Sequence, residues 1–585
     1  MRLLLGFCAA LLVTAGLVPA AEAAESRPIH SYADAIRETA WVETGTDHDH
    51  DGRPDRVAAD VIRPATRVRV PVILDVSPYY ACCGRGNEAQ KKTYAPDGTP
   101  QQFPLFYDNY FVPRGYAVVL ADVGGTNRSS GCFADVESGN AVVNWLNGRA
   151  KAFDAPEGGS PVRADWATGD VGAIGKSQDG ATAIGMAASG IPGLKTVVPI
   201  EGVADNYAQL VANGAPLAAP ENTGSAFTYN ERAAQLCRPF EAELKARAGT
   251  DGDYNAYWQS VNAAAQAGKV RASVLIAQGF GDGVVRADQF AVYWDALGRA
   301  GVPRKAWLSQ AGHVDPFDLQ REQWVRTLHR WFDRWLLGIR NGVEQEPAVH
   351  LETAPDHWTD VRSWPPSAVP ATLRPSGDGT PGERGSGTAT VVDDPAVGRE
   401  QWATQASDAR ALFTGTPLAT PVRVAGSPSV TITASSDTTA ARLGVALVDY
   451  GPAEVRNTAN YGSGIKNLTT RSCWGSSSAA DSACFLDTAT DLVPAGHEIV
   501  AAGWADLGHH ASLRHGHPLV PGRAYTMTFT LSALDHVVPA GHRLGLLLGG
   551  TDGQLFDPAL PPLGDTLTFD LARTSVTLGL TNPEH

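Results

Sequence analysis

Short apolar runs alternate with helix-length segments through the first half of the chain, and this alternation limits the possible folds more than any other feature. Most runs are rich in β-branched residues, and segments such as AVVNWLNGRA (141–150) and ADQFAVYWDALGRAG (287–301) separate several of them. This order predicts a mostly parallel sheet with helices on both faces. The runs are PVILDVSP (71–78), GYAVVLADV (115–123), VGAIGKS (171–177), KTVVPIEG (195–202), ASVLIAQG (272–279) and KAWLSQAGH (305–313).

Changes in this pattern divide the chain into parts. From about residue 205 to residue 270, an Ala-rich, charged segment predicts a helical cap inserted over the sheet. The segment REQWVRTLHRWFDRWLLG (321–338) then predicts one long amphipathic helix whose aromatic residues belong to the core. We therefore expect an α/β domain over 25–345, followed by an all-β sandwich over 346–585, where short alternating runs are separated by Gly, Pro and Asp turns.

The N-terminal residues 1–24 resemble an export signal. One basic residue precedes an apolar run that ends near Leu17, and the small-residue site Ala21-Glu22-Ala23 follows. A membrane anchor is the alternative, but the run is shorter than the ~20 residues that a spanning helix needs. We expect a secreted mature chain that no longer contacts a membrane. Its net charge of −15 argues against binding to nucleic acid, and its oligomeric state is not predicted.

The cysteines fit an exported protein. Without Cys8 an even set remains, and disulfides are favoured because no Cys-x-x-Cys or Cys/His spacing indicates a metal site. Cys473 and Cys484 are close in sequence and form the simplest pair. We expect Cys82 and Cys83 to pair with the remaining cysteines, Cys132 and Cys237, in an order that the sequence leaves open.

Candidate catalytic residues follow three of the predicted strands. Ser177 lies on a tight turn between a strand and a small-residue helix, Asp282 follows the run ending near Gly279, and His313 follows the next run. This chain order and these strand-end positions are those of the α/β-hydrolase topology. Taken singly, each residue has a simpler interpretation: a loop serine, a Gly-Asp-Gly turn and a loop-capping histidine.

The chain resembles the X-prolyl dipeptidyl aminopeptidases and the cocaine-esterase-like hydrolases. GKSQDG is similar to their G-K-S-Y-x-G elbow, in which the second glycine also comes one place later than in G-x-S-x-G. QGFGDGVV and AGHVDP are similar to their acid and histidine segments, and PAGHRLGLLL extends the likeness toward the C-terminus. The resemblance implies an α/β-hydrolase domain with a helical cap, followed by a C-terminal jelly-roll sandwich.

These parts predict a mechanism without a cofactor. Ser177 would attack a carbonyl while His313 accepts its proton and Asp282 orients the imidazole. The backbone N–H of Gln178 would bind the oxyanion, together with the hydroxyl of Tyr79, whose place in SPYY matches the family's oxyanion tyrosine. The alternative for Tyr79 is an aromatic residue at a strand end that packs against the cap.

The substrate is predicted from candidate binding residues in and beside the cap. An aminopeptidase needs a carboxylate for the substrate ammonium, and Glu201 matches a glutamate of the X-prolyl enzymes. Further candidates are the carboxylates Asp205, Glu221 and Glu231 and, for a proline pocket, the aromatic residues Tyr207, Phe227 and Tyr229. The leading hypothesis is a serine exopeptidase that releases X-Pro dipeptides. An esterase or acylase acting on small esters or amides is the alternative, and a binding protein with an inactive hydrolase domain is disfavoured.

The segment DHDHDGRPD (47–55) has half of a calcium-loop signature. Acidic residues occupy positions 1, 3, 5 and 9 with glycine at position 6, but position 12 is Ala58 rather than glutamate. A solvated hairpin loop between two early strands is favoured, and no metal is predicted.

Overall fold

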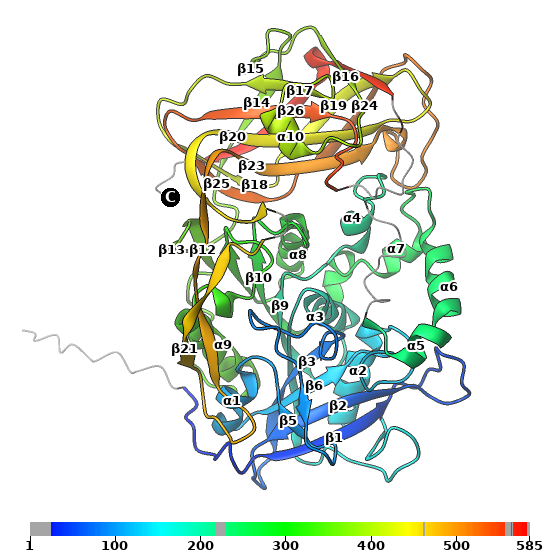
Figure 1. Cartoon of the computed structure of the whole chain (residues 1–585), viewed down its shortest axis with the longest axis vertical. Coiled ribbons are helices and arrows are strands. Elements are labelled where there is room, and N and C mark those ends of the chain that lie inside the picture. The colour runs from blue at the N-terminus through cyan, green and yellow to red at the C-terminus, as the bar shows by residue number, and fades with distance from the viewer. Residues whose placement is uncertain (1–24, 218–227, 460–461, 556–562, 564, 582–585) are drawn as a thin grey trace, which may run out of the picture.

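The structure is a computed structural model that describes residues 25–217, 228–459, 462–555, 563 and 565–581. A mixed α/β part carries a β-rich part at one end (Figure 1). The predicted signal peptide lies outside the described residues, as do Glu221 and Phe227. No helix among the described residues is long and apolar enough to cross a bilayer.

An 11-stranded sheet forms the centre of the α/β part, in the order β13-β12-β11-β10-β9-β8-β3-β6-β2-β1-β7. Neighbours from β12 to β6 pair in parallel, as predicted, and the outer pairs are antiparallel. The strands are β1 (Ile36–Glu43), β2 (Arg56–Arg63), β3 (Val70–Ser77), β6 (Ala117–Asp122), β7 (Ala152–Phe153), β8 (Ala167–Lys176), β9 (Leu194–Ile200), β10 (Ser273–Gly279), β11 (Arg304–Ser309), β12 (Val349–Ala354) and β13 (His357–Val361).

Helices cover both faces of this sheet. Alternate side chains of β3 enter different cores: Val72 and Leu74 pack with α2, α3 and α8, whereas Ile73 packs with α1 and α9. The predicted long helix is confirmed as α9, with Trp324 and Trp331 buried in the second core. The helices are α1 (Tyr107–Phe111), α2 (Asp135–Leu146), α3 (Gln178–Ser189), α8 (Ala287–Arg299) and α9 (Arg321–Leu336); the short strands β4 (Thr93–Tyr94) and β5 (Pro100–Gln102) form a separate pair.

Helical segments occupy the interval between β9 and β10, where the cap is predicted. They lie beside the sheet, on the side of α2 and α3 (Figure 1). Their own small core contains Tyr207, Val211, Ala248 and Trp258. The helices are α4 (Asn206–Leu210), α5 (Glu231–Leu236), α6 (Arg238–Ala248) and α7 (Ala256–Ser260).

The C-terminal part is a β-structure with a nine-stranded and a four-stranded sheet around one apolar core. β12 and β13, which follow residue 345, extend the first sheet instead of joining these two sheets. Its elements are β14 (Val369–Pro375), β15 (Pro381–Gly382), β16 (Thr388–Val392), α10 (Arg399–Thr404), β17 (Arg410–Thr414), β18 (Val422–Gly426), β19 (Ser429–Ser436), β20 (Arg442–Arg456), β23 (Leu492–Asp506), β24 (Tyr525–Thr530), β25 (Leu534–Val538), β26 (Arg543–Gly549), β27 (Thr566–Asp570) and β28 (Ser575–Thr581).

A hairpin of β21 (Ile465–Cys473) and β22 (Cys484–Thr490) leaves the β-rich part and runs along the α/β part toward α1 (Figure 1). Thr488 donates to the carbonyl of Asp318 at 2.7 Å, and Gly312 N–H donates to the carbonyl of Ser463 at 3.1 Å. The hairpin and the turn before it therefore lie against the segment that carries His313.

The cysteine pairing differs from the prediction in one respect. Cys473 pairs with Cys484 across the hairpin, as expected. Cys132 pairs with Cys237, and Cys82 pairs with its neighbour Cys83, so the predicted pairing between these two sets is wrong. Both Cys132 and Cys237 are buried where α5 meets the loop after β6, whereas Cys82 and Cys83 lie together in the turn after β3.

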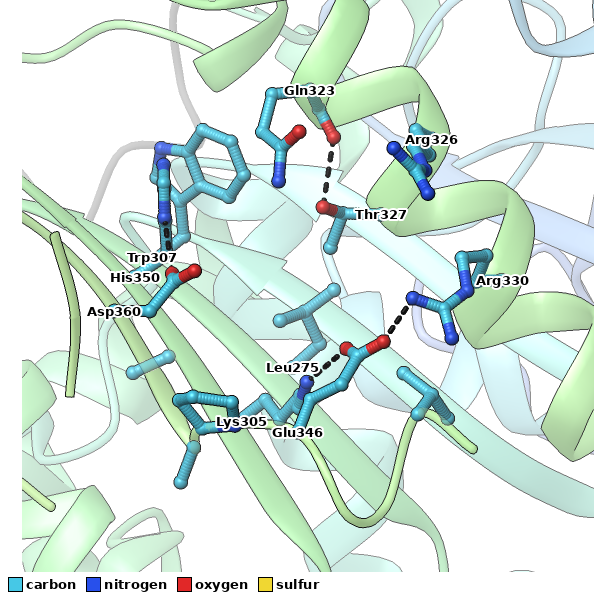
Figure 2. A pocket seen from close by; sticks show the side chains of 14 residues that line it. Leu275, Lys305, Trp307, Gln323, Arg326, Thr327, Arg330, Glu346, His350 and Asp360 are labelled. Atoms are coloured by element: carbon cyan, nitrogen blue, oxygen red, sulfur yellow. Dashed lines mark hydrogen bonds and ion pairs between the residues drawn. The ribbon is translucent and has the colours of Figure 1, made fainter. Parts of the chain in front are cut away.

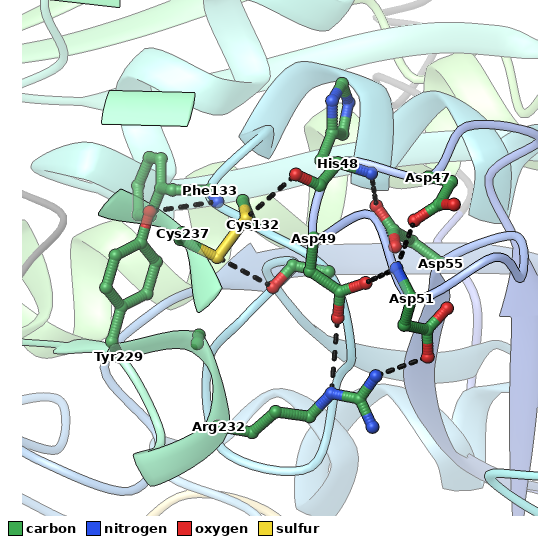
Figure 3. The surroundings of a disulfide bond; sticks show 12 residues. Asp47, His48, Asp49, Asp51, Asp55, Cys132, Phe133, Tyr229, Arg232 and Cys237 are labelled. Atoms are coloured by element: carbon green, nitrogen blue, oxygen red, sulfur yellow. Dashed lines mark hydrogen bonds and ion pairs between the residues drawn. A yellow bond between two sulfur atoms is a disulfide. The ribbon is translucent and has the colours of Figure 1, made fainter. Parts of the chain in front are cut away.

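The acidic segment 47–55 is the hairpin connection between β1 and β2, as predicted, but it is not fully solvated, because Asp49 and Asp55 are buried. Figure 3 shows that it lies beside the Cys132–Cys237 pair and faces Arg232 of α5. The Arg232 guanidinium is 3.2 Å from a carboxylate oxygen of Asp49 and also pairs with Asp51. The loop thus joins the β1–β2 hairpin to the helical cap by an ion-pair cluster next to a disulfide.

Candidate active site

Ser177 occupies a strained turn between β8 and α3. Its backbone has φ +64° and ψ −123°, a region that non-glycine residues rarely adopt, and its N–H donates to the carbonyl of Ile200 at 2.9 Å. A Cβ at Gly180 would lie 2.6 Å from that same carbonyl oxygen, so the turn can be this tight only with glycine there. The turn holds the Ser177 side chain at the carboxyl edge of the sheet, partly exposed.

Asp282 and His313 meet at the ends of the neighbouring strands β10 and β11. His313 Nδ1 is 2.7 Å from Asp282 Oδ2, and the other oxygen of Asp282 accepts the N–H groups of Val284 and Val285. Burial lowers the pKa of His313, and the nearby Lys176 acts in the same direction, so the ring is neutral at pH 7. A neutral ring oriented through Nδ1 leaves Nε2 able to accept a proton.

The hydroxyl of Tyr79 lies 3.4 Å from Ser177 Oγ. No hydrogen bond links Ser177 to His313, although both residues are among those described; such bonds are often loose in a site without substrate. Gln178 is the first residue of α3, so its N–H has no partner within the helix. Its side-chain amide donates to Asp135 at 2.8 Å.

Glu201 lies in a different environment from the one predicted. It is buried directly after β9, where Oε1 accepts the N–H of Val314 at 3.1 Å and Oε2 is 3.1 Å from His313 Nδ1. The carboxylate therefore faces the histidine loop from within the protein. This position does not agree with the prediction that Glu201 binds a substrate ammonium.

The other predicted substrate-binding residues support the cap. Asp205 caps α4 by accepting the N–H of Ala208 at 3.1 Å, and its second oxygen accepts from Asn262 at 2.7 Å. Tyr207 is buried and donates to the carbonyl of Gly252 at 2.7 Å. Glu231 is exposed in the first turn of α5, and the Tyr229 hydroxyl accepts from Phe133 N at 3.3 Å. The predicted assignment of Asp205 and Tyr207 to the substrate site is not supported by these contacts.

The sequence did not predict a buried ion-pair cluster beneath the serine turn. Arg85 pairs with Asp179, two residues after Ser177, and lies 3.6 Å from Asp75 of β3. All three side chains are at most 3% exposed. The only sequence signal was an aspartate where the turn needed no charge, and nothing in the sequence pointed to Arg85 as its partner.

A pocket of about 370 Å³ opens beside His313. Asp315 and Asp318 contribute carboxylates to it, and Ser463, Ile465 and Asn467 from the hairpin region close one side. Another pocket, of about 290 Å³, lies between α9 and the sheet edge (Figure 2). Glu346 bridges Lys305 and Arg330 inside it, and it contains none of the predicted site residues. The first pocket is lined by His313 but by neither Ser177 nor Asp282, so we place the chemistry at its edge.

Two family profiles together match most of the chain. The profile "X-Pro dipeptidyl-peptidase (S15 family)" matches residues 51–315, and "X-Pro dipeptidyl-peptidase C-terminal non-catalytic domain" matches residues 341–585. A "Putative Xaa-Pro dipeptidyl-peptidase" of Streptomyces avermitilis is 48% identical over 98% of this chain and 88% of its own length. A protein of the same name from Bacillus anthracis is 34% identical, over 94% of this chain and 89% of its own.

Solved structures share the fold at low sequence identity. A CocE/NonD family hydrolase from Staphylococcus aureus has a TM-score of 0.68 at 13% identity, covering 94% of both chains. An α-amino acid ester hydrolase has a TM-score of 0.63 at 16% identity and covers 98% of this chain and 100% of its own. The predicted fold class, an α/β-hydrolase domain followed by a β-rich domain, is confirmed. On the profile matches and the identity to its relatives, the chain belongs to the X-Pro dipeptidyl-peptidase (S15) family of serine hydrolases.

Proposed function

We propose that this protein is a secreted serine exopeptidase that releases X-Pro dipeptides from peptide N-termini through Ser177, His313 and Asp282. The observation that carries the proposal is the 2.7 Å contact between His313 and Asp282 at adjacent strand ends, beside the strained turn that presents Ser177. Family membership supports the same substrate class.

The proposed reaction has two displacements. Ser177 Oγ attacks the carbonyl carbon of the substrate's second residue while its proton passes to His313 Nε2. The bond to the third residue's nitrogen then breaks, and His313 protonates the departing amine. Water attacks the resulting acyl-enzyme with the same proton transfers, which frees the dipeptide and restores Ser177. Asp282 keeps its hydrogen bond from Nδ1–H throughout and stabilises the imidazolium that forms in each step.

Tyr79→Phe should lower kcat about 100- to 1000-fold with a much smaller change in KM, because one donor to the oxyanion is lost. Steady-state kinetics measure the effect. Tyr80→Phe is the matched control, since the Tyr80 hydroxyl points to the carbonyl of Asp75 at 3.4 Å within the core. Equal losses in the two variants would remove Tyr79 from the oxyanion site.

For substrate specificity, an alternative function has to be weighed against the exopeptidase. An esterase or acylase gains support because Glu201 and Asp205 are engaged by protein groups instead of facing open solvent. The pocket beside His313 still offers a carboxylate for an ammonium: Asp315 is buried, and its Oδ2 has no hydrogen-bond partner among the described residues. An unpaired buried carboxylate oxygen is costly unless a ligand donates to it.

The deciding experiment compares an Ala-Pro anilide, the same anilide with a blocked N-terminus, and a simple aryl ester. We expect blocking to lower kcat/KM about 30-fold or more, since a desolvated charge pair that loses one partner costs about 2–5 kcal/mol. If free and blocked anilides react equally well while the ester is cleaved faster, the esterase alternative replaces the exopeptidase.

Secretion is proposed from the signal-like residues 1–24 together with three cysteine pairs, since disulfides persist mainly in oxidising compartments. N-terminal sequencing of protein from the culture medium tests it; a chain that still begins at Met1 and stays with the cells would contradict it.

A further inference from the structure

Two carboxylates, not one, face Nδ1 of His313. Asp282 Oδ2 is 2.7 Å from this nitrogen and Glu201 Oε2 is 3.1 Å from it. The Asp282 side chain is 0% exposed and that of Glu201 is 2% exposed. The Asp282 contact has hydrogen-bond geometry, whereas Glu201 Oε2 has no hydrogen-bond partner among the described residues. Nδ1 carries one proton, so in the resting protein Asp282 receives it.

The fold holds Glu201 at this place. Glu201 follows β9, which lies between the strand of Ser177 and the strand of Asp282. Its backbone has φ +48°, and its N–H donates to the carbonyl of Ala277 in β10 at 2.8 Å. A glutamate in this left-handed region is strained and is kept there by its surroundings. Oε1 is fixed by the N–H of Val314, which leaves Oε2 directed at the imidazole.

The charges around Glu201 decide its protonation. Burial raises its pKa most strongly, the negative charge of Asp282 raises it further, and Asp315 adds a smaller effect in the same direction. Lys176 and the Val314 N–H oppose them. Two buried carboxylates this close do not both ionise readily, and the raised pKa of Glu201 favours its protonated form beside Asp282.

We propose that Glu201 is a positioning residue for the reaction: it fixes the loop after His313 through Val314, and it is a second acid that can orient His313 when Asp282 is lost. The inference rests on the proposed triad. Removing the Asp282 charge removes one cause of the raised Glu201 pKa, so Glu201 would ionise more readily and accept Nδ1–H itself. The path of the Ser177 proton to Nε2 would stay the same.

The test is a cycle of Asp282→Ala, Glu201→Gln and the double variant, measured on the aryl ester so that no ammonium contact enters. In a Ser-His-Asp triad with one acid, neutralising the aspartate costs about 10⁴-fold in kcat. Here we expect about 100-fold for Asp282→Ala and tenfold or less for Glu201→Gln, which keeps an oxygen for Val314. The double variant should lose at least a further 100-fold relative to Asp282→Ala.

A pH profile separates this role from simple support of the loop. The remaining activity of Asp282→Ala needs ionised Glu201, so it should be present above the Glu201 pKa and fall as the pH drops through it. That acidic limb should be absent from the double variant. Glu243→Gln, at a glutamate of α6 whose side chain is 70% exposed, is the matched control and should leave all rates unchanged.

The proposal fails if Glu201→Gln costs the same factor with and without Asp282, because Glu201 would then act only on the loop. It also fails if Glu201→Gln slows only anilides with a free N-terminus, which is the role predicted from the sequence. Should Glu201→Gln unfold the protein, Glu201→Asp, which withdraws the charge from Nδ1, replaces it in the same cycle. Failure of the proposed function would look different: the unmutated protein would not hydrolyse the ester or react with a fluorophosphonate.

Discussion

Replacing Ser177 with alanine should lower kcat for every substrate by about 10⁴-fold or more, because the variant has no oxygen to form the acyl-enzyme. The fold should survive. The turn is fixed by the Ser177 backbone bond to Ile200 and by the close approach of Gly180, neither of which involves the serine hydroxyl. Kinetics on an anilide and an ester measure the loss of kcat. Labelling by a fluorophosphonate should be lost as well, and thermal unfolding checks that the fold is kept.

The matched control is Ser189→Ala. Ser189 is an exposed serine at the C-terminal end of α3, the helix that follows Ser177, and its hydroxyl bonds to the carbonyl of Met186 at 2.7 Å. This variant should keep full activity and labelling. Labelling of Ser177→Ala at the rate of the unmutated protein would show that another residue is the nucleophile.

The sequence predicted the fold where the pattern of apolar residues is distinctive, either as a continuous run or at helical spacing. Runs buried on both faces predicted the parallel sheet, and the apolar stripe of 321–338 predicted α9. The sequence could not assign β12 and β13 to a sheet. A short run with alternating apolar residues has the same pattern whether the strand extends one sheet or begins another. The cysteine pairing failed for a related reason: it depends on which loops meet in space, as Cys132 and Cys237 do across 105 residues.

Site residues were predictable to the extent that topology alone sets them. Parallel strands end at one edge, which brings Ser177, Asp282 and His313 to the same side of the sheet. The direction in which a side chain points at that edge cannot be predicted from the spacing of residues in the sequence. Glu201 also follows a strand, yet its left-handed backbone and the Val314 bond turn it toward the back of the imidazole. Asp205 shows the same limit, since a carboxylate before a helix is equally able to cap it.

Asp179→Ala should lower the free energy of unfolding by about 3–5 kcal/mol, because it leaves Arg85 buried with one of its two carboxylates gone. Denaturant unfolding measures the loss. Asp165→Ala is the matched control: Asp165 pairs with Arg163 at 3.3 Å, but both side chains are at least 71% exposed, so stability should barely change. Unaltered stability of Asp179→Ala would mean that Asp75 neutralises Arg85 alone.

The same variant should also slow catalysis, because Arg85 lies on the loop that carries Tyr79. The carbonyl of Tyr79 accepts the N–H groups of Cys83 and Gly84 at 3.1 and 2.9 Å, so movement of Arg85 passes directly to the tyrosine. Arg85→Met in the Asp179→Ala background removes the buried cation, and Asp75, whose pKa burial already raises to about 6, can then take up a proton, so much of the stability should return. It should not restore kcat, since the tie between the serine turn and the Tyr79 loop stays broken. Recovery of both together would assign the pair to stability alone.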